Sequence, residues 1–298
     1  MSTLLSDLSS ALAGAVVTAG PGVVRVSARR RLPATGVAWS ADGLVVTSHH
    51  VVERDEDITV GLDGGATVGA SLVGRDPTTD LAVLRLDGAA LSPLPWAEPD
   101  ALGVGHLVLA LGRPGDSVLA TLGIIGALGG AWRTPGGGEV DRYVQTDVTM
   151  YPGFSGGPLV DASGRILGLN TSALLRGTSL AVPAPTVRRV VEAILTHGRV
   201  RRGYLGVGAQ PVRLAPSLAR TAGQETGLLV LSVEPDSPAE RGGLYVGDTI
   251  VTLDGEPVGD LDALLARLGG DRVGRSVPVR VARGGDVHAV EVTIGERG

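Results

Sequence analysis

Short runs in which apolar and polar residues alternate, separated by turn residues, fill most of the first 185 positions. Two of these runs, residues 36–40 and 44–48, flank Ala41-Asp42-Gly43, which suits a hairpin turn. Further strands are predicted at residues 23–27, 58–62, 66–73, 81–86, 107–111, 118–125, 143–146, 158–160, 166–170 and 179–182. Many short strands at close intervals, with hardly any helix between them, indicate antiparallel barrels.

Two stretches have helical spacing instead. Near the start of the chain, the apolar positions Leu4, Leu5, Leu8 and Leu12 predict a short amphipathic helix. A second helix is predicted at residues 186–197, with Thr186 as a suitable N-cap. Its apolar face consists of Val187, Val190, Val191, Ile194 and Leu195.

The periodicity starts again after the charged stretch 198–203, so a second domain is expected near residue 201. We therefore expect an N-terminal helix at residues 1–18, a barrel domain at 19–185, a linker helix at 186–200 and a C-terminal domain at 201–298. A length of 298 residues is sufficient for about two domains.

The composition gives no reason to expect a nucleic-acid partner. The net charge is −5, and the sequence shows no basic patch that extends along a whole face. The run Arg29-Arg30-Arg31 is interpreted as a solvated loop. Glycine is abundant at 46 residues and aromatic residues make up 3%, which favours short strands, turns and an aliphatic core.

Missing residue types exclude several kinds of chemistry. The chain has no cysteine, so it forms no disulfide, thiol nucleophile or thiolate metal site. All 26 basic residues are arginine, which excludes Ser-Lys dyads and Schiff bases. No metal-binding or phosphate-binding motif is present, and we expect neither a metal nor an organic cofactor.

The N-terminus does not have the features of a targeting segment. It lacks a basic region at its start, and Asp7 interrupts the apolar run. No stretch reaches the roughly 18 uninterrupted apolar residues of a membrane span. We therefore expect no membrane span and a cytoplasmic protein, or an extracytoplasmic one if a segment precedes Met1.

The stretch from Pro152 to Val160 predicts a reactive loop that leads into a buried strand. Its glycines allow backbone N–H groups to point at one spot, as a developing oxyanion requires. A serine nucleophile at Ser155 needs a histidine to take its proton and a carboxylate to orient that histidine. Of the five histidines, His106, His197 and His288 are interpreted as turn, surface or packing residues.

His49 and His50 compete for the role of general base. Adjacent residues of an extended chain point to opposite faces, so at most one of them can face a common site. The residue types alone leave this choice open. A weaker alternative is that His50 and Asp80 are metal ligands together with His49. It is weaker because adjacent histidines diverge and no third suitably spaced ligand lies near them in the sequence.

Three segments resemble the HtrA/DegP-like serine proteases, which have a chymotrypsin-like fold. They are Thr47-Ser48-His49-His50-Val51-Val52, residues 76–86, and Gly153-Phe154-Ser155-Gly156-Gly157-Pro158-Leu159. The resemblance implies that His50 is the general base, Asp80 the orienting acid and Ser155 the nucleophile. The chain order of the three also matches chymotrypsin-like folds. The N–H groups of Gly153 and Ser155 would then form the oxyanion hole.

The same resemblance implies a specificity pocket with Thr149 at its base, lined by Met150 and Ala173. Because these residues are uncharged, cleavage after small to medium apolar residues is expected, rather than after Lys or Arg. Phe154 departs from the asparagine that is usual in the family. Our hypothesis is that activation does not follow the zymogen route, and that a ligand or partner sets the oxyanion hole.

Residues 202–207 resemble the carboxylate-binding loop of the PDZ domains attached to these proteases. Successive N–H groups at Leu205, Gly206 and Val207, next to Tyr204, can hold a chain-terminal carboxylate. Residues 260–268 would form the helix that lines the groove. A peptide with an apolar C-terminal residue would add as a strand beside residues 205–210.

The resemblance covers residues from about 20 to 296 and implies a mostly β chain, a chymotrypsin-like double β-barrel followed by a small α+β PDZ domain. It implies a serine endopeptidase that acts on unfolded or damaged proteins and binds apolar C-terminal tails. Family members usually form homotrimers. The alternative from another class is a peptide-binding or chaperone-like protein with a latent or inactive site, which Phe154 favours.

Overall fold

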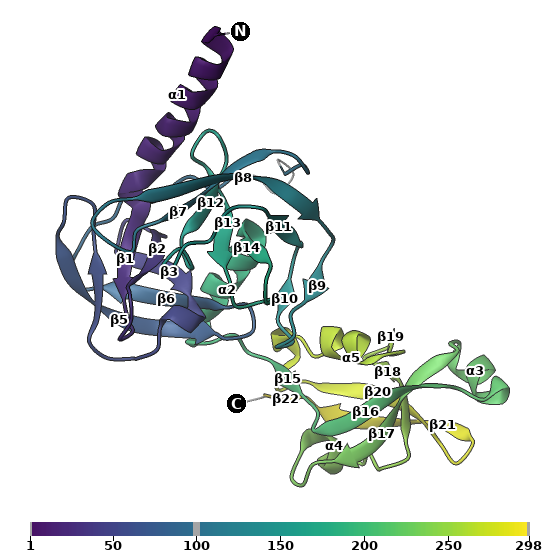
Figure 1. Ribbon diagram of the computed structural model, residues 1–298. Coiled ribbons are helices and arrows are strands. Elements are labelled where there is room, and N and C mark those ends of the chain that lie inside the picture. The colour runs from purple at the N-terminus through teal and green to yellow at the C-terminus, as the bar shows by residue number, and fades with distance from the viewer. Residues whose placement is uncertain (1, 98–101, 297–298) are drawn as a thin grey trace. The chain divides into compact units, whose positions relative to one another are not determined.

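The chain folds into two compact units, residues 1–200 and 201–298, in a computed structural model that describes residues 2–97 and 102–296 (Figure 1). The first unit contains both barrels. The strands of the first barrel close in the order β1-β2-β3-β6-β5-β4, with antiparallel pairing throughout. They are β1 (Val23–Ser27), β2 (Ala34–Ala38), β3 (Leu44–Ser48), β4 (Ile58–Gly61), β5 (Thr67–Asp76) and β6 (Leu81–Leu86).

Strand β3 shows why the first-barrel strands are so apolar. Val45 packs in the cluster inside the first barrel, whereas Val46 packs in the cluster that also contains second-barrel residues. Both faces are therefore buried. The register of β3 against β6 pairs Ser48 with Leu81. This register brings the residues that follow β3 next to those that precede β6.

The second barrel closes in the order β11-β14-β13-β12-β7-β8. Its strands are β7 (Leu107–Gly112), β8 (Leu119–Leu128), β11 (Val144–Thr146), β12 (Pro158–Val160), β13 (Ile166–Thr171) and β14 (Ser179–Pro183). A small hairpin of β9 (Trp132–Arg133) and β10 (Glu139–Val140) lies between β8 and β11 in the chain. The expectation of a mostly β chain with two barrels is confirmed.

Helix α2 (Ala184–His197) packs against the first unit through Val187, Val190, Val191 and Ile194. Leu195 is 43% exposed and does not belong to the buried face. The prediction that Thr186 caps this helix is wrong, because the helix begins two residues earlier, after Pro183. The Thr186 hydroxyl instead donates to Asp141 Oδ2 at 2.6 Å and accepts from the Asp141 N–H.

Helix α1 (Ser2–Ala19), followed by a short 3₁₀ turn (Gly20–Gly22), projects from the first unit (Figure 1). Its last turns pack on the barrels through Ala15 and Ala19, whereas Leu4 and Leu5 are 73% and 70% exposed. Residues Thr3–Gly22 are long and apolar enough to cross a membrane, and 11% of this stretch is buried, unlike a core helix. Asp7 was expected to rule out a membrane span because it interrupts the apolar run. A single charged residue does not rule it out.

The second unit is a sheet with strand order β16-β17-β18-β20-β21 and helices at its margins. Its strands are β15 (Gly203–Tyr204), β16 (Val207–Arg213), β17 (Thr226–Val233), β18 (Thr249–Leu253), β19 (Glu256–Pro257), β20 (Ser276–Arg283), β21 (Asp286–Thr293) and β22 (Gly295–Glu296). Its helices are α3 (Pro216–Ala222), α4 (Pro238–Arg241), α5 (Leu261–Arg267) and a 3₁₀ turn (Gly270–Arg272). β15 pairs with β22, and β19 pairs with β18.

An ion pair between Asp248 and Arg283 supports the second unit. Asp248 is 2% exposed and accepts bonds of 2.6 and 2.7 Å from Arg283 and one of 2.8 Å from the Tyr245 N–H. Burial by itself would raise the pKa of the Asp248 carboxyl, but the bonds from Arg283 and Tyr245 outweigh it and hold this pKa below its ordinary value. This stabilisation is therefore present at neutral pH and lost as the pH falls through the acidic range.

The substitution Arg283→Gln is expected to lower the free energy of unfolding of the second unit by about 1–3 kcal/mol at pH 7. Urea denaturation of the full chain, followed by a probe in that unit, measures it. The control Arg280→Gln lies on the same strand and should cost about 0.5 kcal/mol or less. The difference between wild type and Arg283→Gln should shrink at low pH, and a difference independent of pH would contradict this role.

Candidate active site

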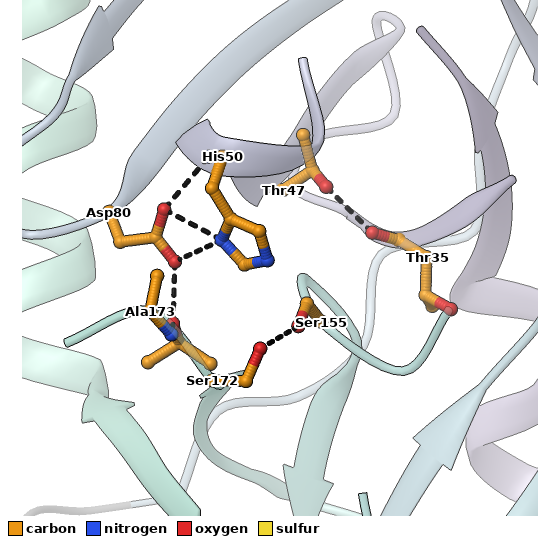
Figure 2. A network of polar contacts seen from close by, with 8 residues as sticks. Thr35, Thr47, His50, Asp80, Ser155, Ser172 and Ala173 are labelled. Carbon is orange, nitrogen blue, oxygen red and sulfur yellow. Dashed lines mark hydrogen bonds and ion pairs between the residues drawn. The ribbon is translucent and has the colours of Figure 1, made fainter. Parts of the chain in front are cut away.

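His50 and Asp80 meet where β3 ends and β6 begins (Figure 2). The His50 ring Nδ1 is 2.8 Å from Asp80 Oδ2 and 3.0 Å from Oδ1. The backbone also joins the two segments, because the His50 N–H donates to Asp80 Oδ1 at 2.9 Å and the His49 N–H to the Asp80 carbonyl at 3.0 Å. A carboxylate at Nδ1 fixes the tautomer in which Nδ1 carries the proton and Nε2 is free to accept one.

The Asp80 carboxyl is 2% exposed. Burial by itself would raise its pKa, but the bond from the His50 ring, the nearby His50 charge, the Thr171 hydroxyl and the His50 N–H together hold the pKa below its ordinary value. Thr171 Oγ1 donates to Asp80 Oδ2 at 2.5 Å. The arrangement therefore keeps Asp80 ionised at neutral pH.

Among the described hydrogen bonds, the ring of His49, the competing histidine, makes none to the Asp80 carboxylate. Residues His49–Val51 form a 3₁₀ turn. The directions of the two histidine side chains therefore follow the geometry of this turn and not the alternation of an extended strand. The His49 Nδ1 atom is buried and has no hydrogen-bond partner among the described residues. Burial, together with Arg75, lowers the pKa of His49, so its ring is neutral at neutral pH. Among residues 2–97 and 102–296, no group of three potential ligands could hold a metal ion, so the metal alternative is not supported.

Ser155 lies just before β12, beside the His50 ring (Figure 2). The Ser155 hydroxyl forms a hydrogen bond of 3.2 Å with the Ser172 hydroxyl. Within the described part of the chain it forms none with the His50 ring. Sequence reasoning missed Ser172, although it is adjacent to Ala173, which the sequence placed in the specificity pocket. His50, Asp80 and Ser155 are thus brought together, with Ser172 as an unexpected fourth member.

The first barrel holds the Ser155 loop through Thr35 on β2. The Thr35 hydroxyl donates to the Gly153 carbonyl at 2.6 Å and accepts from the Arg113 N–H at 2.8 Å, and the Thr35 N–H donates to the Ser155 carbonyl at 3.3 Å. Gly153 has φ +91°, which favours glycine. Among the described hydrogen bonds, none uses the N–H of Gly153 or Ser155, so both can serve an oxyanion.

Phe154 is fully buried in the core of the second barrel. Its ring makes an edge-to-face contact with Tyr151, with centroids 5.7 Å apart. It also lies directly over Gly112, where a Cβ atom would be 2.4 Å from the ring. Phe154, which departs from the usual asparagine, therefore fixes the Ser155 loop to the core of the second barrel. Glycine at position 112 leaves the space that the ring occupies.

The residues expected to form the specificity pocket do not share one enclosed cavity. Thr149 and Ala173 are exposed, and Ala173 adjoins Ser172. Met150 packs against the core cluster that contains Phe154. A cavity of about 600 Å³ is instead lined by other residues, among them Leu128, Arg142 and Pro185. These three positions remain a prediction.

In the second unit, the segment from Tyr204 to Val207 connects β15 to β16. Gly206 has φ +83° and lies against Ser237, so the backbone turns sharply there. Among the described hydrogen bonds, none uses the N–H of Leu205 or Gly206. The Tyr204 hydroxyl bonds to the Glu234 carboxylate. Such N–H groups at a glycine turn are the kind of donor that binds an anion, and the peptide-binding role of residues 204–207 stays a prediction.

Comparisons with known proteins agree with this geometry. Residues 34–169 match the trypsin-like peptidase domain family, and residues 203–294 match the PDZ domain family. The solved HtrA-type protease AlgW with a decapeptide is 31% identical with a TM-score of 0.79, over 96% of this chain and 99% of that one. The serine endoprotease from Yersinia pestis is 32% identical with a TM-score of 0.80, over 96% and 98%.

Curated sequences give the same result. A probable periplasmic serine endoprotease DegP-like from Halomonas elongata is 37% identical over 284 residues, 93% of this chain and 59% of that protein. One from Ectopseudomonas mendocina is 38% identical over 269 residues, 88% and 56%. The chain thus spans somewhat over half the length of these relatives. It belongs to the HtrA/DegP-like family of serine endoproteases and combines a trypsin-like peptidase domain with a PDZ domain.

The expectation of a cytoplasmic location is wrong. The curated relatives are named as periplasmic proteins, and the exposed helix at Thr3–Gly22 has the length and composition of a membrane-crossing segment. The sequence argument failed because it required a basic start and an unbroken apolar run. A stretch of 20 residues with a single charge and a mean hydropathy of 1.3 meets the requirement of length and composition without either feature.

Proposed function

We propose that this chain hydrolyses peptide bonds with Ser155 as nucleophile, His50 as general base and then acid, and Asp80 as the group that orients His50. The 2.8 Å contact between His50 Nδ1 and Asp80 carries the proposal, because it leaves Nε2 facing Ser155. The oxyanion would bind the N–H groups of Gly153 and Ser155. His50 would then protonate the leaving amine, and water would release the acyl group.

We further propose that the substrates are unfolded or damaged proteins, cut after small to medium apolar residues held near Thr149, Met150 and Ala173. Apolar C-terminal tails would bind at residues 204–207 of the PDZ domain. The solved relative AlgW, with a decapeptide and with a tripeptide, supports peptide binding. A homotrimer is proposed because α1 and β8 expose large apolar residues, among them Leu4, Leu5, Leu119 and Leu122.

One observation favours the second candidate, a latent or inactive peptide-binding protein. The Ser155 hydroxyl pairs with Ser172 and not with His50, so the proton-transfer contact is not made in this state. An active enzyme must exchange this bond for one to His50. The two candidates therefore differ in whether Ser155 reacts in the absence of a peptide.

A fluorophosphonate probe distinguishes the two candidates. The proposed enzyme labels at Ser155 in the full chain, and an added peptide with an apolar C-terminus changes the labelling rate. The Ser155→Ala variant serves as the control and should not label. If wild type fails to label with or without peptide, and cleaves an unfolded protein no faster than Ser155→Ala, the protease proposal is wrong and the binding candidate stands.

The substitution Ser172→Ala is expected to speed up labelling of Ser155 by about two- to tenfold, since a neutral hydrogen bond is worth about 0.5–1.5 kcal/mol. The rate constant of fluorophosphonate modification measures it. Ser179→Ala is the matched control, because Ser179 donates to the Val148 carbonyl at 3.2 Å in the same barrel. An equal or slower rate in Ser172→Ala would show that Ser172 does not restrain the nucleophile.

A further inference from the structure

The loop between β1 and β2, residues Arg29–Pro33, lies against the Ser155 loop. A Cβ atom at Gly153 would be 2.8 Å from the Pro33 carbonyl, so the two backbones touch at the oxyanion position. Two residues later, Thr35 bonds to both Gly153 and Ser155. The run of three arginines was interpreted as a solvated loop. It precedes Pro33 in the chain and therefore lies next to the candidate active site.

This loop carries unneutralised positive charge. Arg30 and Arg31 are exposed, and the half-buried Arg29 donates from Nε to the Leu32 carbonyl at 2.8 Å, which shapes the loop. Arg54 adds a fourth guanidinium, since it donates to the Ser27 carbonyl at 3.1 Å. Within residues 2–97 and 102–296, none of these four arginines forms an ion pair.

Neighbouring carboxylates do not pair with these arginines in the described part of the chain. Asp55 is already paired with Arg75. Glu53, whose N–H bonds to the Ala28 carbonyl, is the acidic residue fixed closest to the arginines along the backbone. Glu56 and Asp57 follow Asp55 in the same segment, and in the described part of the chain none of Glu53, Glu56 and Asp57 forms an ion pair with an arginine, so the exposed Arg30 and Arg31 stay available for other carboxylates. Asp and Glu side chains of another molecule are the natural counterparts of these two guanidinium groups.

The position of the loop decides which part of a substrate it meets. Figure 2 shows Ser155 between Ser172 on one side and Thr35 on the other, in agreement with the bonds of Ser155 to both residues. The proposed pocket for the residue before the scissile bond lies with Ala173 on the Ser172 side. His50 must protonate the leaving amine, and it belongs to the first barrel. The leaving segment therefore passes over the first barrel on the Thr35 side, toward residues 29–33.

We propose that Arg30 and Arg31 bind acidic residues that follow the scissile bond, and that the preferred substrates are unfolded segments with Asp or Glu two or three residues after an apolar cleavage site. An extended chain advances about 3.3 Å per residue, so these positions lie about 7–10 Å beyond the reacting carbon, within reach of an arginine side chain. This inference rests on the proposed protease function. Each of these solvent-exposed ion pairs should contribute modestly to substrate binding, and its contribution should fall as the salt concentration rises.

Two peptides that differ in charge test the proposal on the full chain. Both contain Val-Ala followed by either Glu-Glu or Gln-Gln, with cleavage after Val, and both end in an amide so that they do not bind the PDZ domain as carboxylates. Wild type should cleave the Glu-Glu peptide with about two- to fivefold higher kcat/KM, as expected for exposed ion pairs, and 0.5 M salt should remove the preference. The double variant Arg30→Gln/Arg31→Gln should lose it.

The control Arg188→Gln/Arg220→Gln removes the same net charge from exposed positions on α2 and α3 and should keep the preference. Equal kcat/KM ratios in wild type and in Arg30→Gln/Arg31→Gln would overturn the proposal. If the wild type proves inactive, anisotropy with Ser155→Ala still decides. Tighter binding of the Glu-Glu peptide that Arg30→Gln/Arg31→Gln abolishes would support the arginine surface, and equal Kd values would refute it.

Discussion

Replacing Asp80 with asparagine is expected to lower kcat for peptide hydrolysis by about 10⁴-fold while the fold stays intact. Asp80 has φ +58°, and asparagine is one of the few residues that tolerate this conformation. An amide would donate a hydrogen bond to His50 Nδ1 and so place the ring proton on Nε2. In that tautomer His50 cannot accept the Ser155 proton. Steady-state kinetics on an unfolded protein substrate measures the loss.

The matched control is Asp76→Asn. Asp76 is also buried and accepts bonds from the Thr78 and Thr79 hydroxyls in the turn that leads to Asp80, whereas the described bonds of the His50 ring go to Asp80. It should cost stability and leave most of kcat. Equal losses of kcat in both variants would mean that the turn matters, and not the orientation of His50. Because the pKa of Asp80 is depressed, wild-type stability from this group should decline as the pH falls through the acidic range.

Phe154→Ala is expected to lower the free energy of unfolding of the first unit by about 3–5 kcal/mol. The ring is fully buried, and its removal leaves a cavity over Gly112. Chemical denaturation measures the loss. Tyr151→Ala serves as the control, because Tyr151 touches the same ring but is 54% exposed and should cost about 1 kcal/mol.

A double-mutant cycle tests whether the ring and Gly112 fit one another. Gly112→Ala alone should destabilise the protein by about 1–3 kcal/mol, because the new methyl group overlaps the Phe154 ring. In the Phe154→Ala background the same substitution should cost much less, since the methyl group enters the cavity. The difference is the coupling energy. Additive effects would show that the ring does not depend on the space above Gly112.

The barrels could be predicted because their strands alternate between two buried clusters and end at turn residues. The identities of His50, Asp80 and Ser155 came from resemblance, since residue types left His49 and His50 open. The register that pairs Ser48 with Leu81 brings His50 to Asp80, and the pattern within one strand does not say which distant strand it pairs with. Ser172 and Thr35 were missed for the same reason. Thr35 bonds to Gly153 across 118 positions of the chain, and its own strand is apolar and wholly buried.

The close packing of Phe154 over Gly112 also constrains how this sequence can change. The two positions lie on different segments, one at the end of β7 and one in the loop before β12. A side chain at position 112 overlaps the ring at 154, so either position can accept a larger residue cheaply only if the other accepts a smaller one. Substitutions at these two distant positions are therefore expected to be tolerated as a pair more readily than one at a time.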